Sequence, residues 1–304
     1  MSKNQLSAAD QIARIRKKLK HFTLDKPVDS WLDTGSKRLN AVLGSEELGI
    51  PYGRMLEIYG PNSHGKTMIA LFLAAVAQAN GAKVAWVDLE RSFDERWVTS
   101  QGVKFNEVFL FQTEILKKGE DVELQSAEEL FEEVEYWMKE EHRANPDQKL
   151  LIVVDSVAAI LTGEEADAGL SGQNMRTNMA LPSFLSKMLR KWVALSANCN
   201  AMVILINQIR AALGTYGAPE YAPGGNASKH YCSIRATVRR VKGGRLTHMG
   251  KVVGLRGVIK NVKNKAGGGS LEGGECGYET LFGKRKWKFP TVAEVRKDGK
   301  EGEE

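Results

Sequence analysis

Little cysteine and no long apolar run characterise this 304-residue chain. Its three cysteines, Cys199, Cys232 and Cys276, are odd in number and far apart, which argues against a disulfide framework or a zinc site. The longest apolar runs, LLIVVDSVAAIL and AMVILI, are too short to cross a bilayer. The N-terminus, MSKNQLSAADQ, has no apolar signal segment. We therefore expect a cytoplasmic globular protein with no membrane partner.

The charge balance is mildly basic. Lysine and arginine number 43 against 37 aspartate and glutamate, a formal net charge of +6. The hydrophobic and charged fractions, 42% and 26%, are ordinary for a globular protein. A small positive excess is compatible with a polyanionic partner but does not identify one.

Apolar strands alternate with helical patterns through most of the chain. GRMLEIYG, KVAWVDLE, EVFLFQ, LLIVVDSV and AMVILINQ have the composition of buried strands. Helical patterns lie between them, at 66–79, 93–101, 125–142 and 180–198. This alternation predicts an α/β fold with a mostly parallel central sheet flanked by helices. The later segments CSIRATVRRVK and VGLRGVIKNVKNK are expected to extend that sheet.

Three other segments stand outside this pattern. Residues 7–21 have the spacing of a short basic amphipathic helix, followed by an extended linker. Residues 162–178 and 209–226 are glycine-containing polar stretches that interrupt the strand–helix alternation. Long loops in a compact domain are usually functional or disordered, so both are candidate binding segments.

Residues 60–67, GPNSHGKT, fit the spacing of a phosphate-binding P-loop. Gly60 and Gly65 let backbone amides curl around phosphate oxygens, and the helix that begins near Lys66 points its positive end at the anion. Lys66 is placed to reach the terminal phosphates, and the Thr67 hydroxyl to ligate Mg²⁺. The alternative is a glycine-rich turn without a ligand.

Acidic residues end two of the predicted strands. Asp155 follows LLIVV, at the strand end where open α/β sheets bind ligands, and suits a role in holding Mg²⁺. Glu90 ends WVDLE and is a candidate for orienting the attacking water. Asp88 points to the same side in an extended strand, so the spacing leaves the choice between the two open. A helix-capping role is the alternative for each.

Several motifs occur together in a fixed order. GRMLEIYGPNSHGKT, VAWVDLERSFDERW, LLIVVDSVAAI, INQIRAAL, PGGNASKHYCSIRATVRR and VKNK closely resemble the bacterial RecA recombinases, over about residues 30–265. The P-loop alone is generic, whereas the NQIR, GGNASK and VKNK segments together are specific to that family.

The resemblance assigns roles to individual residues. It implies catalytic roles for Glu90, Lys66, Gln208, Lys263 and Lys265. It implies ATP contacts from Gly60, Pro61, Asn62, Ser63, His64, Gly65, Lys66, Thr67, Met68, Asp94, Trp97 and Asp155, with Thr67 and Asp155 at the metal. Lys263 and Lys265 would reach the nucleotide of the neighbouring subunit, and Gln208 would sense the γ-phosphate.

The resemblance also implies DNA contacts from the two interrupting segments and the helix between them. The residues are Arg176, Arg190, Arg210, Leu213, Gly224, Gly225 and Asn226. Arginines and glycine amides grip phosphates without reading sequence, and an apolar wedge can separate stacked bases. The alternative for each arginine is a solvated surface charge.

The implied organisation is a polymerisation helix and linker over residues 1–32, a RecA-like ATPase core over 33–270 and a short C-terminal extension over 271–304. The implied function is ATP-dependent strand exchange by a helical filament on single-stranded DNA, with a homologous duplex as the second DNA. A ring-shaped helicase-like motor, a small-molecule phosphotransferase and a non-enzymatic ATP switch are the alternatives.

Some positions depart from the family pattern. Asn62 stands where bacterial members commonly have glutamate, and His230 stands at a position that is typically aromatic. We expect His64 to be a loop side chain that faces solvent. KRKWK, at 284–288, is either a solvated edge strand or a nucleic-acid contact.

Overall fold

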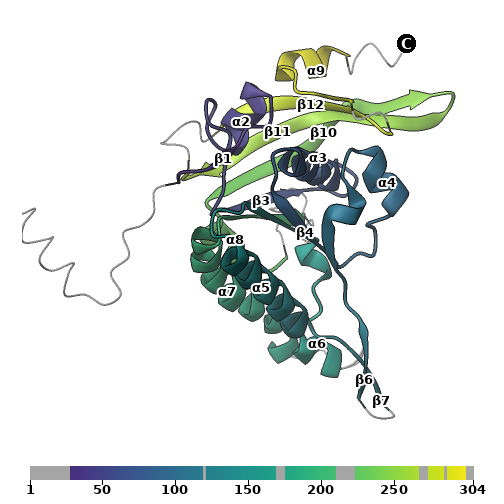
Figure 1. The fold of residues 1–304 in the computed structure, drawn as a ribbon. Helices are drawn as coiled ribbons and strands as arrows, with labels where there is room; N and C mark the ends of the chain where they lie inside the picture. Colours follow the sequence, from purple (N-terminus) through teal and green to yellow (C-terminus); the bar gives the residue numbers. More distant parts are fainter. Residues whose placement is uncertain are drawn as a thin grey trace, which may run out of the picture.

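The computed structural model describes residues 28–118, 121–168, 175–209, 223–266, 273–283 and 286–298 (Figure 1). Within these ranges nine strands form one large sheet, in the order β13-β12-β11-β10-β3-β9-β8-β4-β5. The predicted α/β class, with a mostly parallel central sheet between helices, is confirmed. The basic helix expected over residues 7–21 lies outside the described residues.

Six neighbouring strands of this sheet run parallel. They are β5 (Val108–Phe111), β4 (Lys83–Asp88), β8 (Leu150–Asp155), β9 (Ala201–Gln208), β3 (Met55–Gly60) and β10 (Ile234–His248). Because parallel strands end at one edge of a sheet, the last residues of β3, β4, β8 and β9 meet there.

Three antiparallel strands extend the sheet beyond β10. They are β11 (Lys251–Asn264), β12 (Glu275–Leu281) and β13 (Lys286–Lys288). The segment expected as a C-terminal extension thus supplies β12 and β13 to the same sheet. β13 is its last strand, in keeping with the edge-strand interpretation of KRKWK.

Helices cover both faces of the sheet (Figure 1). One face packs against α2 (Lys37–Leu43), α3 (Lys66–Ala79) and α4 (Glu95–Ser100), and the other against α5 (Ala127–Ala144) and α7 (Met175–Asn198). Side chains alternate between two cores: Leu151 and Val153 enter the first, and Ile152 and Val154 the second. This period of two explains why the buried strands are continuously apolar.

The remaining described elements are short. They are β1 (Trp31–Leu32), β2 (Ile50–Pro51), β6 (Ile115–Lys118), β7 (Asp121–Leu124), α6 (Gly163–Asp167), α8 (Ala227–Tyr231), α9 (Val292–Asp298) and the 3₁₀ turns η1 (Phe105–Glu107) and η2 (Val157–Ala159). β6 and β7 form a hairpin that projects from the body (Figure 1). In the described parts of the chain, no helix combines the length and apolarity needed to cross a membrane.

The polar segment 162–178 is partly helical, which the sequence did not predict. α6 begins with a capping box, in which Thr162 and Glu165 satisfy each other's backbone amides, and α7 already begins at Met175. A helix as short as α6 cannot show a hydrophobic period, so its capping residues are the only sequence signal that predicts it.

Candidate functional site

The predicted phosphate loop connects β3 to α3. Gly60 ends β3, Lys66 begins α3, and Gly65 caps the helix with a φ of 87°. This left-handed conformation favours glycine, because a Cβ is strained there. The 14-residue α3 therefore directs its N-terminal amides and its positive dipole end toward the loop, which is the geometry of an anion site.

Lys66 and Thr67 lie beside Asp155. The Thr67 hydroxyl donates to Asp155 Oδ2 at 2.9 Å, and the Lys66 ammonium donates to the Pro61 carbonyl at 2.8 Å. The pKa of Asp155 is raised to about 7, mainly by burial and also by the nearby carboxylates of Glu90 and Asp88. The hydrogen bond from Thr67 lowers this pKa but does not offset the effect of burial. Burial also lowers the pKa of Lys66. A divalent cation at the two oxygens would favour the ionised carboxylate.

Two oxygen ligands suit Mg²⁺, which usually takes one or two protein oxygens and completes its shell with phosphates and water. Within the described ranges, no group of three or more histidine, cysteine, aspartate or glutamate side chains is arranged to hold a metal. The residues present therefore fit an ion held jointly with a phosphate ligand.

Glu90 lies at the same edge of the sheet, in contact with two other strand ends. Its Oε1 accepts hydrogen bonds from Ser156 Oγ at 2.5 Å and from Gln208 Nε2 at 2.8 Å. Glu90 remains exposed. The carboxylate is thus held by two donors while its other oxygen is available to solvent or ligand. Sequence reasoning missed Ser156, and its position directly after Asp155 was the only signal.

The choice between Asp88 and Glu90 is decided by the hydrogen bonds of Asp88. Its carboxylate is fully buried and accepts from the amides of Ser92 and Phe93, each at 3.0 Å, and from Gln112 Nε2 at 2.8 Å. Both oxygens are committed to folding the turn that follows β4. Asp88 therefore has a structural part in this turn, whereas Glu90 is the exposed carboxylate of the two and the better candidate for contact with a ligand.

The expected adenine contacts lie on α4. Asp94 caps this helix by accepting from the Trp97 amide at 2.8 Å, and its side chain is exposed. The rings of Trp97 and Phe282 form a T-shaped pair with a centroid distance of 5.4 Å. Phe282, which sequence reasoning missed, follows β12 and supplies a second aromatic surface at this place.

Lys263 and Lys265 do not approach the phosphate loop of their own chain. The Lys263 ammonium donates to the carbonyls of Lys229 at 2.6 Å and His230 at 3.2 Å, and burial lowers its pKa, as does the nearby charge of Lys265. The Lys265 amide bonds to Ser233, whose own amide bonds to Met55. Lys265 is therefore level with the start of β3, about 17 Å along the strand from Gly60.

The predicted DNA-binding residues are only partly described. Arg190 is exposed on α7. Gly225 and Asn226 are exposed just before α8, whereas Gly224 is buried against α7, where a Cβ would lie 2.2 Å from Leu185.

The other predicted DNA-binding residues are Arg176, Arg210 and Leu213. Arg210 and Leu213 lie outside the described residues. Arg176 falls in the first turn of α7 rather than in a loop, and its side chain lies outside the described part.

The other loop residues differ in their surroundings. Asn62 and Ser63 are exposed, and the Met68 side chain is buried, so Met68 can offer a ligand only its backbone. The expectation that His64 faces solvent was wrong, because its Nδ1 accepts from the Arg240 amide at 3.1 Å and the ring is half-buried. Burial and the charges of Arg240, Lys66 and Arg239 lower the pKa of His64.

A buried polar network lies beneath the site. Arg235 Nε donates to Glu57 Oε2 at 2.6 Å, and the guanidinium lies 4.6 Å from the centroid of the Tyr59 ring. Asn207 Nδ2 donates to Glu57 Oε1 and to the Pro223 carbonyl, both at 3.1 Å. The network joins β3, β9 and β10 and fixes the residue before Gln208 and the segment that begins at Pro223.

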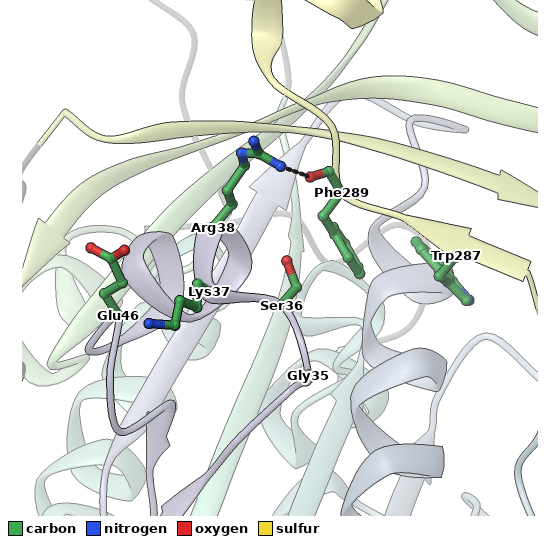
Figure 2. Close-up of a pocket in the computed structure, with 7 residues that line it drawn as sticks. All are labelled: Gly35, Ser36, Lys37, Arg38, Glu46, Trp287 and Phe289. Carbon is green, nitrogen blue, oxygen red and sulfur yellow. Dashed lines mark hydrogen bonds between the residues drawn. The ribbon is translucent and has the colours of Figure 1, made fainter.

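A cavity of about 580 Å³ lies elsewhere, between α2 and the segment after β13 (Figure 2). Lys37, Arg38, Trp287 and Phe289 are among its lining residues, and Arg38 donates to the Phe289 carbonyl at 3.4 Å. Its lining includes no residue of the phosphate loop. This cavity is therefore separate from the candidate nucleotide site.

Comparison with known proteins gives consistent matches. A family profile described as RecA N-terminal domain matches residues 15–271. Protein RecA of Ruminococcus albus is 35% identical over 254 residues, which are 83% of this chain and 57% of that protein. Protein RecA of Thermus thermophilus is 38% identical over 236 residues, which are 77% of this chain and 62% of that protein. Protein RecA of Pseudomonas putida is 34% identical over 254 residues, covering 83% and 64%.

The matched segments span between 57% and 64% of the length of these relatives. The profile match includes every strand of the parallel part of the sheet and the phosphate loop. The resemblance expected from the motifs is confirmed by the profile and by these relatives together. This chain belongs to the RecA family.

Proposed function

We propose that this protein is an ATP-dependent DNA recombinase, which assembles as a helical filament on single-stranded DNA and pairs it with a homologous duplex. The observation that carries the proposal is the hydrogen bond from Gln208 to Glu90. It joins the carboxylate that we propose for hydrolysis to the last residue of β9, after which the expected DNA-binding segment follows in the sequence. The carboxylate proposed for hydrolysis is thereby in direct contact with a residue that closely precedes the proposed DNA-binding segment.

In this proposal the phosphate loop binds ATP through its amides and Lys66. Thr67 and Asp155 would hold Mg²⁺, which neutralises charge on the phosphates when it is bound. Trp97 and Phe282 offer aromatic surfaces for the adenine.

Glu90 acts on the attacking water. Its carboxylate orients the water and accepts a proton, while Ser156 holds the side chain in place. Gln208 exchanges its bond to Glu90 for one to the terminal phosphate. That exchange moves the end of β9 and so reports the bound nucleotide to the DNA-binding segment.

Lys263 and Lys265 complete the site of an adjacent protomer. Their distance from their own phosphate loop and their position near the surface support this assignment. A lysine supplied across an interface would place positive charge at the transition state only after protomers stack, so assembly would control turnover.

DNA-stimulated turnover is the first expected result. ATP hydrolysis by the purified protein should rise at least about tenfold when single-stranded DNA is added, because assembly brings the lysines of one protomer to the nucleotide of the next. Steady-state phosphate release with and without DNA measures this. Turnover unchanged by DNA would contradict the proposal. Electron microscopy separates open helices from the closed rings of a helicase-like motor.

Lys263→Ala should slow DNA-stimulated turnover by about 10- to 100-fold, with nucleotide affinity of the single chain unchanged. The effect is limited because Lys265 remains. Lys260→Ala is the matched control, since Lys260 is exposed on the same strand and pairs with Glu275. Wild-type stimulation in the Lys263 variant would refute the role across the interface.

A further inference from the structure

Tyr278, on β12, contacts the back of the phosphate loop. Its ring is fully buried, and its hydroxyl donates to the His64 carbonyl at 2.6 Å. β12 belongs to the antiparallel part of the sheet, two strands beyond β10. A strand near the far end of the chain therefore reaches a loop near its beginning.

The Tyr278 ring is tightly packed against two glycines. A Cβ at Gly257, the register partner of Tyr278 on β11, would lie 2.5 Å from the ring and from the hydroxyl. A Cβ at Gly65 would lie 3.2 Å from the hydroxyl. Two glycines thus accommodate Tyr278, one beneath it and one in the loop itself.

Arg240, on β10, also bonds to the same loop. The His64 ring accepts from the Arg240 amide, and the Arg240 side chain donates to the Ser63 carbonyl at 3.4 Å. Both contacts come from β10, so residues 63 and 64 are tied to two strands of the extended sheet.

We propose that Tyr278 is a positioning residue for phosphate binding, acting by fixing the peptide between His64 and Gly65. In a trans peptide the carbonyl and the following amide point in opposite directions. With the carbonyl held by Tyr278, the Gly65 amide points away from β12, toward the cradle. The inference rests on the proposed ATP-binding function and assigns to this chain a support for it outside the P-loop motif.

The peptide needs such a support because glycine follows it. Gly65 adopts positive and negative φ with similar ease, so rotation of this peptide plane is inexpensive. A rotated plane would present a carbonyl to the phosphate in place of an amide. Tyr278 and the His64–Arg240 contact restrict the loop to the conformation that donates, which preorganises the site.

Tyr278→Phe tests this, because it removes only the hydroxyl. We expect ADP, measured by calorimetry with Mg²⁺ on the full chain, to bind about 3- to 10-fold more weakly. Tyr52→Phe is the matched control: Tyr52 is also buried in the first core, but lies before β3, at its end away from the loop. Both variants should fold, and only the first should lose affinity.

Wild-type ADP affinity in Tyr278→Phe, or an equal loss in Tyr52→Phe, would overturn the inference. If Tyr278→Phe does not fold, His64→Ala carries the same test through the second contact, with a loss of about 2- to 5-fold expected and wild-type affinity contradicting it. Lys66→Ala tests the nucleotide site itself. If both Lys66→Ala and Tyr278→Phe bind ADP with wild-type affinity, the proposed nucleotide site is wrong. If Lys66→Ala loses ADP binding and Tyr278→Phe does not, only the proposed role of Tyr278 is wrong.

Discussion

Glu90→Gln is expected to bind ATP as the wild type does and to hydrolyse it about 100- to 10,000-fold more slowly, since the amide cannot accept the proton of the attacking water. The variant side chain has the same shape, and its amide oxygen can still accept from Ser156 and Gln208. Folding and nucleotide binding should therefore be retained. Single-turnover phosphate release, together with ADP affinity, separates the chemical step from binding.

Glu95→Gln is the control for this experiment, because Glu95 is an exposed carboxylate on α4. It should hydrolyse ATP at the wild-type rate. Turnover within a few-fold of wild type in the Glu90 variant would exclude Glu90 as the base. Asp88→Asn should instead lower stability, since Asp88 is buried with two backbone amides on its carboxylate.

Arg235→Ala is expected to lower the free energy of unfolding by about 3–5 kcal/mol, because it leaves Glu57 as an uncompensated buried charge. The side chains of Arg235 and Glu57 are 9% and 1% exposed. The loss is large relative to the total stability of an ordinary domain. Urea or thermal unfolding at neutral pH measures it.

The matched control is Arg256→Ala, in the same sheet. Arg256 pairs with Glu279 at 2.7 Å, but these side chains are 13% and 16% exposed, so the loss should be smaller, about 1 kcal/mol. Replacing both partners, as Glu57→Leu with Arg235→Met, should recover much of the stability lost in Arg235→Ala. An equal loss of unfolding free energy in the two arginine variants would show that the stability contributed by an ion pair does not depend on its burial.

The parallel half of the fold could be predicted from sequence. β3, β4, β8 and β9 are continuous apolar runs bounded by turn residues, and each ends in a residue of the candidate site or within two residues of one. Because the carboxyl ends of parallel strands share one edge, strand prediction brought Asp155 and Glu90 together; Lys66 came from the P-loop spacing, and Gln208 from the family resemblance. The α/β class followed from the alternation of strands and helices, and the family from the order of the motifs along the chain.

What sequence missed depends on contacts between distant segments. Alternation predicts Asp88 and Glu90 on one side of a single strand, whereas β4 ends at Asp88. Only the fold of the following turn distinguishes the buried carboxylate from the exposed one. No local pattern links Tyr278 to His64, which are 214 positions apart. Phe282, which packs against Trp97, likewise follows a strand whose place in the sheet was not predicted.

The place of β3 in the sheet has a consequence for biosynthesis. Its hydrogen-bonded neighbours are β9 and β10, which begin at Ala201 and Ile234. A ribosome must add about 140 residues after the phosphate loop before either exists, which takes on the order of 10 s. Throughout that interval the apolar residues Met55, Leu56 and Ile58 lack their strand partners on the nascent chain, so we expect this strand to need protection by chaperones during translation.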